Sequence, residues 1–378
     1  MRDAFIVGAV RTATGRQNGV YRDTHPVHLA AAVLREVTRR AGVDPALVED
    51  VILGCVTPME EQGANIARTA LLHAGFPVEV PGVQINRMCG SSQQAVHFAA
   101  QAIIAGDMDI VLAGGIEHMT RVPMASDWPT GGIPGWPYEW VHQGQSAEMV
   151  AARWGLTREE LDDFGYRSHL RAAHATRAGY FEREIMPLSV LLNGEDVVVT
   201  RDEGIRMEPD RRRMAELRPV FREDGVITAG NSSQISDGAA ALIIASEDAI
   251  RRHNLTPRAR IAARAVAADD PVIMLTAPIP ATRRVLERAG LSVADIDLFE
   301  INEAFASVVL AWQHEIGPDM ERVNVNGGAI ANGHPLGATG AKLMTTLLHE
   351  MERREVRYGL QVMCIGHGQA TATILERV

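Results

Sequence analysis

Cys89 lies in a setting that could make a cysteine a nucleophile. It belongs to Asn86–Ala95 (Asn-Arg-Met-Cys-Gly-Ser-Ser-Gln-Gln-Ala), which follows an apolar stretch and opens a long Ala-rich helical pattern. At a helix N-terminus the macrodipole and the free N–H groups favour thiolate over thiol, and the thiolate is the attacking species. A cysteine there can equally be a small buried apolar residue, so other parts of the sequence must decide between the two interpretations.

A histidine and a second cysteine lie in comparable settings later in the chain. His334 belongs to Asn326–Gly340, whose many glycines predict close approach of the backbone to a ligand or another segment, and Pro335 suits a first helical position. The imidazole could accept a thiol proton or donate to an oxyanion, although a lone loop histidine is more often simply solvated. Cys364 ends a strand-like run and becomes a candidate acid or base if it meets the other two residues.

Short apolar runs alternate with helical patterns along the chain, which predicts an α/β fold. The segment 93–105 is apolar almost all round and should be a buried helix. The expected strands are 4–8, 51–54, 109–113, 240–245, 297–301, 361–365 and 371–375, and the expected helices are 29–41, 93–105, 282–289 and 342–352.

An internal duplication suggests how these distant residues could meet. The segment Arg40–Leu53 resembles Arg288–Phe299, with a helix end, a second short helix and a strand in each. Each copy is followed by a Gly-rich turn that opens a helix and then by a strand that ends in glycine. Two such units related by a pseudo-twofold axis would bring the turns together, so we expect Cys89, His334 and Cys364 to share one pocket.

Residues from about 118 to 225 interrupt the alternation of strands and helices. They contain four of the five tryptophans, a Gly/Pro-rich loop at 129–135 and an Arg-rich stretch at 201–222. We interpret this segment as an insertion that covers one face of the core.

Composition limits the possible locations and partners. The chain is 46% hydrophobic and 22% charged, and no apolar run approaches the roughly 18 residues that span a bilayer. The start of the chain is too short for a signal-peptide core, so we expect a cytoplasmic protein that does not bind membranes. A net charge of −10 argues against binding to nucleic acid. Three cysteines without ligand spacing predict free thiols and no metal site.

Four ordered motifs, spread from the first half of the chain to its end, resemble the thiolase family. They are Asn86–Ser92, Asn302–Ala306, Gly327–Gly340 and Cys364–Gly368. The resemblance implies an α/β fold, a five-layered αβαβα sandwich of two similar halves with an inserted loop domain that binds coenzyme A. The implied parts are an N-terminal half at 1–117 completed by 229–253, the loop domain at 118–228 and a C-terminal half at 254–378.

The resemblance also implies an activity and roles for five residues. Such enzymes are acyltransferases that catalyse CoA-dependent thiolysis of 3-ketoacyl-CoA, as in fatty-acid β-oxidation, or the reverse Claisen condensation, in a ping-pong cycle. Cys89 would carry the acyl group, Cys364 would be the acid and base, and His334 would activate Cys89. Asn302 would hold a water at the enolate oxygen, and the N–H groups of Cys89 and Gly366 would form an oxyanion hole.

Residues for substrate binding and assembly carry over from the same resemblance. Coenzyme A is a substrate rather than a permanently bound cofactor, and family members are homodimers or homotetramers. Five positions of this sequence match coenzyme A contacts or could hold its phosphates: Ser233, His142, Arg206, Arg213 and Phe305. A run of arginines such as 211–213 can also be an ordinary solvated face.

The sequence departs from the family pattern at several positions. His367 and Gln369 replace glycine that many relatives carry, Asn332 replaces an apolar residue, and Gln143 stands where acetoacetyl-specific members often have methionine. We hypothesise that His367 influences chain-length preference or the pH optimum. Two alternatives remain: a 3-ketoacyl carrier-protein synthase, which needs no second thiol, and a catalytically weak CoA-binding or scaffold protein.

Overall fold

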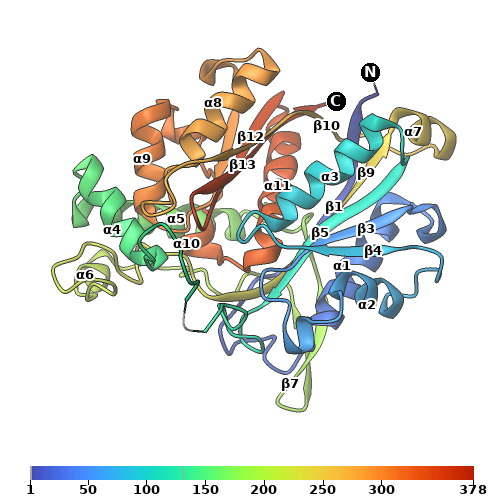
Figure 1. Cartoon of the computed structure of the whole chain (residues 1–378). Helices are drawn as coiled ribbons and strands as arrows, with labels where there is room; N and C mark the ends of the chain where they lie inside the picture. Colours follow the sequence, from blue (N-terminus) through green and yellow to red (C-terminus); the bar gives the residue numbers. More distant parts are fainter. Residues whose placement is uncertain (1, 131) are drawn as a thin grey trace.

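The structure of the chain is a computed structural model that describes residues 2–130 and 132–378. Gly131, within the Gly/Pro-rich loop predicted at 129–135, lies outside the described residues. No helix of the described part is long and apolar enough to cross a membrane. The two ends of the chain lie near each other on one side of the molecule (Figure 1).

Two halves with the same strand pattern form the core (Figure 1). In each half two parallel strands are followed by two antiparallel ones, and the first half adds β4 at its edge. The halves join where β1 and β10 pair through Phe5–Arg260 and Ile6–Ala259. In sheet order the strands are β4 (Gly82–Ile85), β3 (Asp50–Gly54), β5 (Ile110–His118), β9 (Ser236–Ser246) and β1 (Ala4–Thr12), then β10 (Ala259–Ala268), β13 (Gln369–Arg377), β12 (Tyr358–Ile365) and β11 (Leu298–Ile301).

Helices cover both halves and fill the space between them. Two central helices, α3 (Ser91–Ala105) and α11 (Leu336–Arg354), share one apolar core with strands of both halves, so they are buried from both sides. Outside the first half lie α1 (Pro26–Ala41) and α2 (Ile66–His73), and outside the second lie α8 (Pro278–Ala289) and α9 (Ala306–Ile316). The order helix, sheet, helix, sheet, helix confirms the expected five-layered sandwich of two similar halves.

The duplicated segments make the same local contacts in both halves. A glycine in the left-handed region, Gly42 or Gly290, ends a helix, and a short 3-10 helix follows, Pro45–Leu47 or Val293–Asp295. An acidic side chain then accepts hydrogen bonds from backbone N–H groups at the start of the neighbouring strand. Glu49 accepts from Asp109 and Ile110, and Asp297 accepts from Arg357 and Tyr358.

The segment between β5 and β9 has helices and short strands of its own and packs on the core. Its longest helix starts with a capping box in which Thr157 and Glu160 satisfy each other's backbone N–H groups. A short strand of this segment pairs with β1, which attaches the segment to the first half. Its elements are α4 (Gln143–Trp154), α5 (Arg158–Arg177), β6 (Ile185–Met186), β7 (Leu188–Leu192), β8 (Glu195–Val199) and α6 (Arg211–Ala215).

Candidate active site

Cys89 lies in a tight turn between β4 and α3. The residue before it, Met88, has a φ of 43°, an uncommon conformation for a residue other than glycine. The Ser91 hydroxyl stabilises the turn, because it accepts from the Arg87 N–H at 2.9 Å and donates to the Met88 carbonyl at 2.6 Å. The turn leaves Cys89 one residue before the N-cap of α3, Gly90, with only 6% of its surface exposed.

The turn of Cys89 lies directly against the end of β12 in the other half. A Cβ on Gly90 would overlap the side chain of Ile365, so only glycine permits this approach. The N–H groups of Cys89 and Gly366 lie close enough to the Cys89 sulfur to lower its pKa, and the Cys364 sulfur lies close enough to raise it electrostatically. The structure therefore brings together Cys89, Cys364 and Gly366, which come from opposite halves.

Asn302 connects the second cysteine with the histidine. Its side-chain nitrogen Nδ2 lies 3.3 Å from Nε2 of His334 and 3.8 Å from the sulfur of Cys364. The other side-chain atom, Oδ1, is buried and has no hydrogen-bond partner among the described residues. Asn302 follows β11, and its own backbone N–H is bonded to Val362 on β12 at 3.0 Å, so its position is fixed by the sheet.

The hydrogen bonds of His334 define which ring nitrogen carries the proton. Nδ1 lies 2.6 Å from the hydroxyl of Thr339, and that hydroxyl donates its single hydrogen to the Pro335 carbonyl at 2.7 Å. The hydroxyl can therefore only accept from His334, so we assign the proton to Nδ1. Nε2 is then an acceptor, in keeping with the amide donor of Asn302. Its lone pair accepts from the Asn302 amide, which also contacts the sulfur of Cys364.

Glycines and a buried acid bring the start of α11 against the first half. A Cβ on Gly337 would come within 2.7 Å of the Ile116 carbonyl, so the predicted close approach occurs between two protein segments. The Gly337 N–H donates to the carboxylate of Glu117 at 2.9 Å. Glu117 also accepts from Val56, Thr57 and Gln62, and burial raises its pKa. It is favourably placed at the positive end of the helix.

The protonation states of the two thiols differ from the sequence-based expectation. We expected the helix start to favour a thiolate, but burial raises the pKa of Cys89 to about 12 and that of Cys364 to about 11. Hydrogen bonds from the N–H groups of Cys89 and Gly366 lower the pKa of Cys89, yet they do not offset the loss of water around the sulfur. Both cysteines are therefore thiols at neutral pH, and a base must take the proton during the reaction.

His334 is suited to that task because it is uncharged. Burial, with a smaller contribution from the nearby charge of Lys342, lowers the pKa of His334 to about 3. A neutral imidazole whose Nε2 carries no hydrogen can accept a proton, whereas an imidazolium could not. The site thus combines two thiols, one neutral imidazole and one amide, all of them buried.

Aromatic rings lead from the second cysteine to the inserted segment. Cys364 shares an apolar cluster with Phe305, which packs edge-on against Phe221 at 6.0 Å between ring centroids. Phe221 in turn stacks on His142, at the start of α4, at 5.2 Å. Ser233 lies beside this row, since its N–H donates to the Ala304 carbonyl at 2.9 Å. Three of the predicted coenzyme A contacts, Phe305, His142 and Ser233, therefore lie along one path to Cys364.

The two arginines predicted to contact coenzyme A lie apart from the thiols. Arg206 and Arg213 are exposed, and Arg213 lies 3.7 Å from Asp210 at the start of α6. The hydrogen bonds and ion pairs of the described residues do not connect either arginine to Cys89, His334 or Cys364. Their neighbour Arg211 pairs with Asp163 and lies over the ring of Tyr166, so one member of the Arg run has a structural role.

His367 is surrounded by tryptophans of the inserted segment. Its ring centroid lies 5.4 Å from that of Trp140, 5.9 Å from Trp136 and 6.4 Å from Trp128. His367 directly follows Gly366, whose N–H contacts the Cys89 sulfur. The tryptophans and the histidine are thus one aromatic cluster beside Cys89, a connection that the sequence motifs alone did not reveal.

Sequence reasoning missed several residues that hold the site in place. Glu117 was not singled out. Thr339 lies in the motif Gly327–Gly340 and Lys342 at the start of the helix expected at 342–352, but neither residue was given a role. A buried acid or lysine gives no sequence signal until its partners are known, because those partners come from other segments. Within the described ranges, no group of three or more His, Cys, Asp or Glu side chains could hold a metal ion.

Comparison with known proteins identifies the family. The family model described as "Thiolase, N-terminal domain" matches residues 4–133 and 136–248, and "Thiolase, C-terminal domain" matches residues 255–377. The crystal structure of the Bacillus anthracis acetyl-CoA acetyltransferase superposes with a TM-score of 0.94 at 39% identity, covering 100% of this chain and 99% of that one. These matches favour this family over the carrier-protein synthase considered above.

Proteins named as thiolases are similar to this chain over its whole length. The steroid 3-ketoacyl-CoA thiolase FadA6 of Mycobacterium tuberculosis is 48% identical, over 100% of this chain and 95% of that protein. A 3-ketoacyl-CoA thiolase of Idiomarina loihiensis is 47% identical and a beta-ketoadipyl-CoA thiolase of Escherichia coli is 46% identical, both over the full length of each chain. With two family models and these relatives in agreement, the chain belongs to the thiolase family of acyltransferases, whose reaction is the CoA-dependent thiolysis of 3-ketoacyl-CoA or its reverse.

Proposed function

We propose that this chain cleaves 3-ketoacyl-CoA through an acyl intermediate on Cys89, with His334 and Cys364 as the proton-transfer groups. The observation that carries the proposal is the position of Asn302, whose amide lies between the His334 imidazole and the Cys364 thiol. The influence of the Gly366 N–H and of Cys364 on the pKa of Cys89 also supports the proposal, because it links the proposed nucleophile to the proposed acid and to an oxyanion donor.

The first half-reaction uses the thiol of Cys89. Its proton passes to Nε2 of His334 as the sulfur attacks the 3-keto carbon, so that no free thiolate is needed. Breaking of the bond between C2 and C3 leaves the acyl group on Cys89 and the enolate of acetyl-CoA. The enolate oxygen is stabilised by protonated His334 and by a water held by Asn302, whose Oδ1 is free to accept a hydrogen bond. Cys364 then donates its proton to C2.

The second half-reaction transfers the acyl group to coenzyme A. The Cys364 thiolate takes the proton of the incoming thiol, and the sulfur of coenzyme A attacks the acyl thioester. The N–H groups of Cys89 and Gly366 both reach the Cys89 sulfur and can donate to the developing oxyanion, each contributing about 3–4 kcal/mol. Cys89 leaves and regains its proton from His334, which restores the starting state.

Coenzyme A approaches along the row of His142, Phe221 and Phe305, in this proposal. Ser233 contacts the pantetheine arm, and Arg206 and Arg213 meet the adenine and phosphate end at the exposed surface. The protein acts as a homodimer or homotetramer. In support of assembly, β4 is an edge strand of the sheet and carries an exposed valine, Val83. Light scattering of the purified protein tests this part, and a monomer at micromolar concentration would contradict it.

A thiolysis assay with 3-ketoacyl-CoA substrates of graded length tests the function. We expect acetyl-CoA and a shortened acyl-CoA as products, with parallel double-reciprocal plots for the two substrates. Without coenzyme A, mass spectrometry should show one acyl group on the peptide of Cys89 and none in Cys89→Ser. A protein that binds acyl-CoA but forms no acyl adduct would instead be the scaffold considered above.

A further inference from the structure

Lys342 is a buried lysine that none of the steps above uses. It lies on α11, about two helical turns after His334, and only 2% of its surface is exposed. Its ammonium donates to the Asn332 carbonyl at 3.1 Å, to the Asn332 side-chain oxygen at 2.6 Å and to the Gly333 carbonyl at 2.8 Å. An ammonium has three hydrogens, so all of them point to the two residues that precede His334.

These three hydrogen bonds hold the segment 332–334, whose backbone conformation is already restricted by other contacts. Gly333 has a φ of 84°, and a Cβ there would overlap the hydroxyl of Ser236. The His334 N–H donates to that same hydroxyl at 3.1 Å. Thr339 and Lys342 belong to one helix, so α11 holds the His334 ring through Thr339 and the preceding backbone through Lys342. Both contacts therefore bear on the orientation of the ring relative to Asn302.

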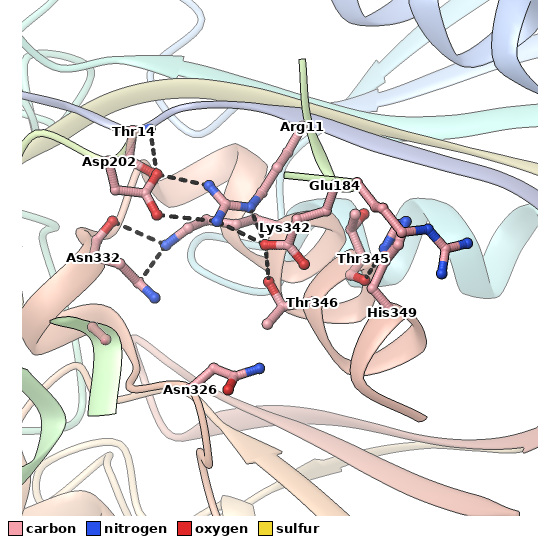
Figure 2. Close-up of polar contacts among 12 residues, drawn as sticks. Arg11, Thr14, Glu184, Asp202, Asn326, Asn332, Lys342, Thr345, Thr346 and His349 are labelled. Carbon is pink, nitrogen blue, oxygen red and sulfur yellow. Dashed lines mark hydrogen bonds and ion pairs between the residues drawn. The ribbon is translucent and has the colours of Figure 1, made fainter. Parts of the chain in front are cut away.

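A buried ionic network compensates the charge of Lys342 (Figure 2). Arg11 of β1 forms two hydrogen bonds with Asp202, at 2.7 and 3.0 Å, and one with Glu184 at 2.7 Å. Asp202 and Glu184 belong to the inserted segment, and both influence the pKa of Lys342. In Figure 2 the lysine lies between this network and Asn332. The carboxylates of the network favour the positive charge of the ammonium, and Asn332 accepts its hydrogen bonds.

We propose that Lys342 is a positioning residue for His334, acting through the backbone of Asn332 and Gly333 and through the Asn332 side chain. The inference rests on the proposed role of His334 as the base. It also gives Asn332 a role, because its side-chain oxygen supplies the third acceptor for the ammonium. The link between the network and the segment before His334 is electrostatic, through the charge of Lys342.

Substitutions at both ends of this contact test the proposal in the full-length enzyme. Lys342→Met removes all three hydrogen bonds, and Asn332→Leu removes only the side-chain acceptor while Lys342 and its ionic partners stay. We expect kcat to fall about 100-fold in Lys342→Met and about three- to tenfold in Asn332→Leu, with KM within about threefold of wild type, since misplacing a catalytic group lowers the rate of chemistry. The double variant should lose no more than Lys342→Met, because both changes act on one contact.

The matched control is Thr345→Val, which changes a buried residue one turn along α11 whose hydroxyl bonds only to its own helix at 2.8 Å. It should keep the wild-type kcat. A second control, His334→Ala, separates the two proposals. If His334→Ala loses activity while Lys342→Met and Asn332→Leu keep kcat, the positioning role is wrong and the proposed function stands.

Other outcomes also decide the question. If His334→Ala retains the wild-type rate of Cys89 acylation, the proposed base is wrong and the role of Lys342 fails with it. A rise in KM with unchanged kcat in Asn332→Leu would show a loss of substrate binding and would overturn the positioning role. Should Lys342→Met not fold, Asn332→Leu decides alone: a lower kcat supports the proposal, and an unchanged kcat overturns it.

Discussion

The starts of the two central helices occupy equivalent places in the two halves, yet they are built differently. Cys89 lies one residue before Gly90, the N-cap of α3, and His334 lies one residue before Pro335, the N-cap of α11. Neither cap residue supplies a side-chain hydrogen bond to its helix. The duplication has thus placed a sulfur at one helix start and an imidazole at the other.

The surroundings of the two residues differ in polarity. Cys89 belongs to a cluster of apolar side chains, and the polar groups that lower the pKa of its thiol are the backbone N–H groups of Cys89 and Gly366. The ring of His334 is bonded to Thr339 and Asn302, and its backbone is held by Ser236. A thiol has no tautomers, so its surroundings need mainly to exclude water and to fit the substrate. An imidazole must show one chosen nitrogen in one direction, which requires fixed polar partners.

The largest effect we expect is the loss of activity in Cys89→Ser. The hydroxyl is a far weaker nucleophile than the thiol and lies beside the same neutral base, so kcat for thiolysis should fall about 10⁴-fold or more. Cys55→Ala is the matched control, since Cys55 is another buried cysteine of the first half. Its kcat should stay within about threefold of wild type. Similar losses in both variants would mean that the reaction depends on packing rather than on Cys89 as nucleophile.

The next largest effect concerns the stability that the buried ionic network of Arg11, Asp202 and Glu184 gives to the protein. Arg11→Met leaves the buried carboxylates of Asp202 and Glu184 without their cation, which should lower the free energy of unfolding by about 3–5 kcal/mol. Met119→Leu, in the apolar cluster around Cys89, conserves volume and should cost less than about 1.5 kcal/mol. Denaturant unfolding of both variants measures the difference. Equal losses would show that the ionic network contributes no more than ordinary packing.

Much of the fold could be predicted because the two halves repeat one pattern of apolar runs. The exceptions have a physical reason. Strand β10 reads Ala-Arg-Ile-Ala-Ala-Arg-Ala-Val-Ala-Ala, and alanine has low strand propensity, so the run was not recognised although its residues alternate between buried and partly exposed. Strand β4 has four residues and contains a glycine and a glutamine. The long helix α5 is mostly polar, and its position depends on contacts with distant segments.

The residues that the structure brings together at the candidate site could be found from local motifs, but their protonation states could not. The argument from the helix start counts N–H groups near the sulfur and predicts a thiolate. It leaves out the cost of burial, which is set by residues from both halves and exceeds the effect of the N–H groups. Residues such as Glu117 and Lys342 were missed for the same reason, since their partners lie far away in the sequence.

The pH dependence of Cys89 alkylation tests whether the surroundings of this thiol are as apolar as the structure indicates. The raised pKa of Cys89, about 12, means that its thiolate fraction grows tenfold for each pH unit up to that value. His334, with its pKa lowered to about 3, stays neutral and forms no ion pair above pH 5. Iodoacetamide labelling of Cys89, followed by peptide mass mapping, should therefore rise about tenfold per unit from pH 6 to 9.

A plateau in that labelling near pH 7 would point to a preformed thiolate and imidazolium pair, and the contrast between the two helix starts would then be wrong. His334→Ala is the control for this measurement. Because the imidazole stays uncharged in wild type, its removal should leave the slope with pH unchanged. A slope that changes in this variant would show that His334 titrates together with Cys89.

The smallest effect concerns His367, which stands beside Cys89 within the tryptophan cluster. Its φ of 56° is a conformation that glycine adopts more easily, so His367→Gly should fold and should enlarge the space next to the acyl group. We expect the ratio of kcat/KM between long and short 3-ketoacyl-CoA substrates to shift by about two- to tenfold. Trp136→Ala, which removes one ring packed on His367, should shift the ratio in the same direction. An unchanged ratio and pH optimum in His367→Gly would exclude His367 from the acyl site. The apolar surroundings of Cys89 would then consist of its own cluster alone, without the tryptophans and His367.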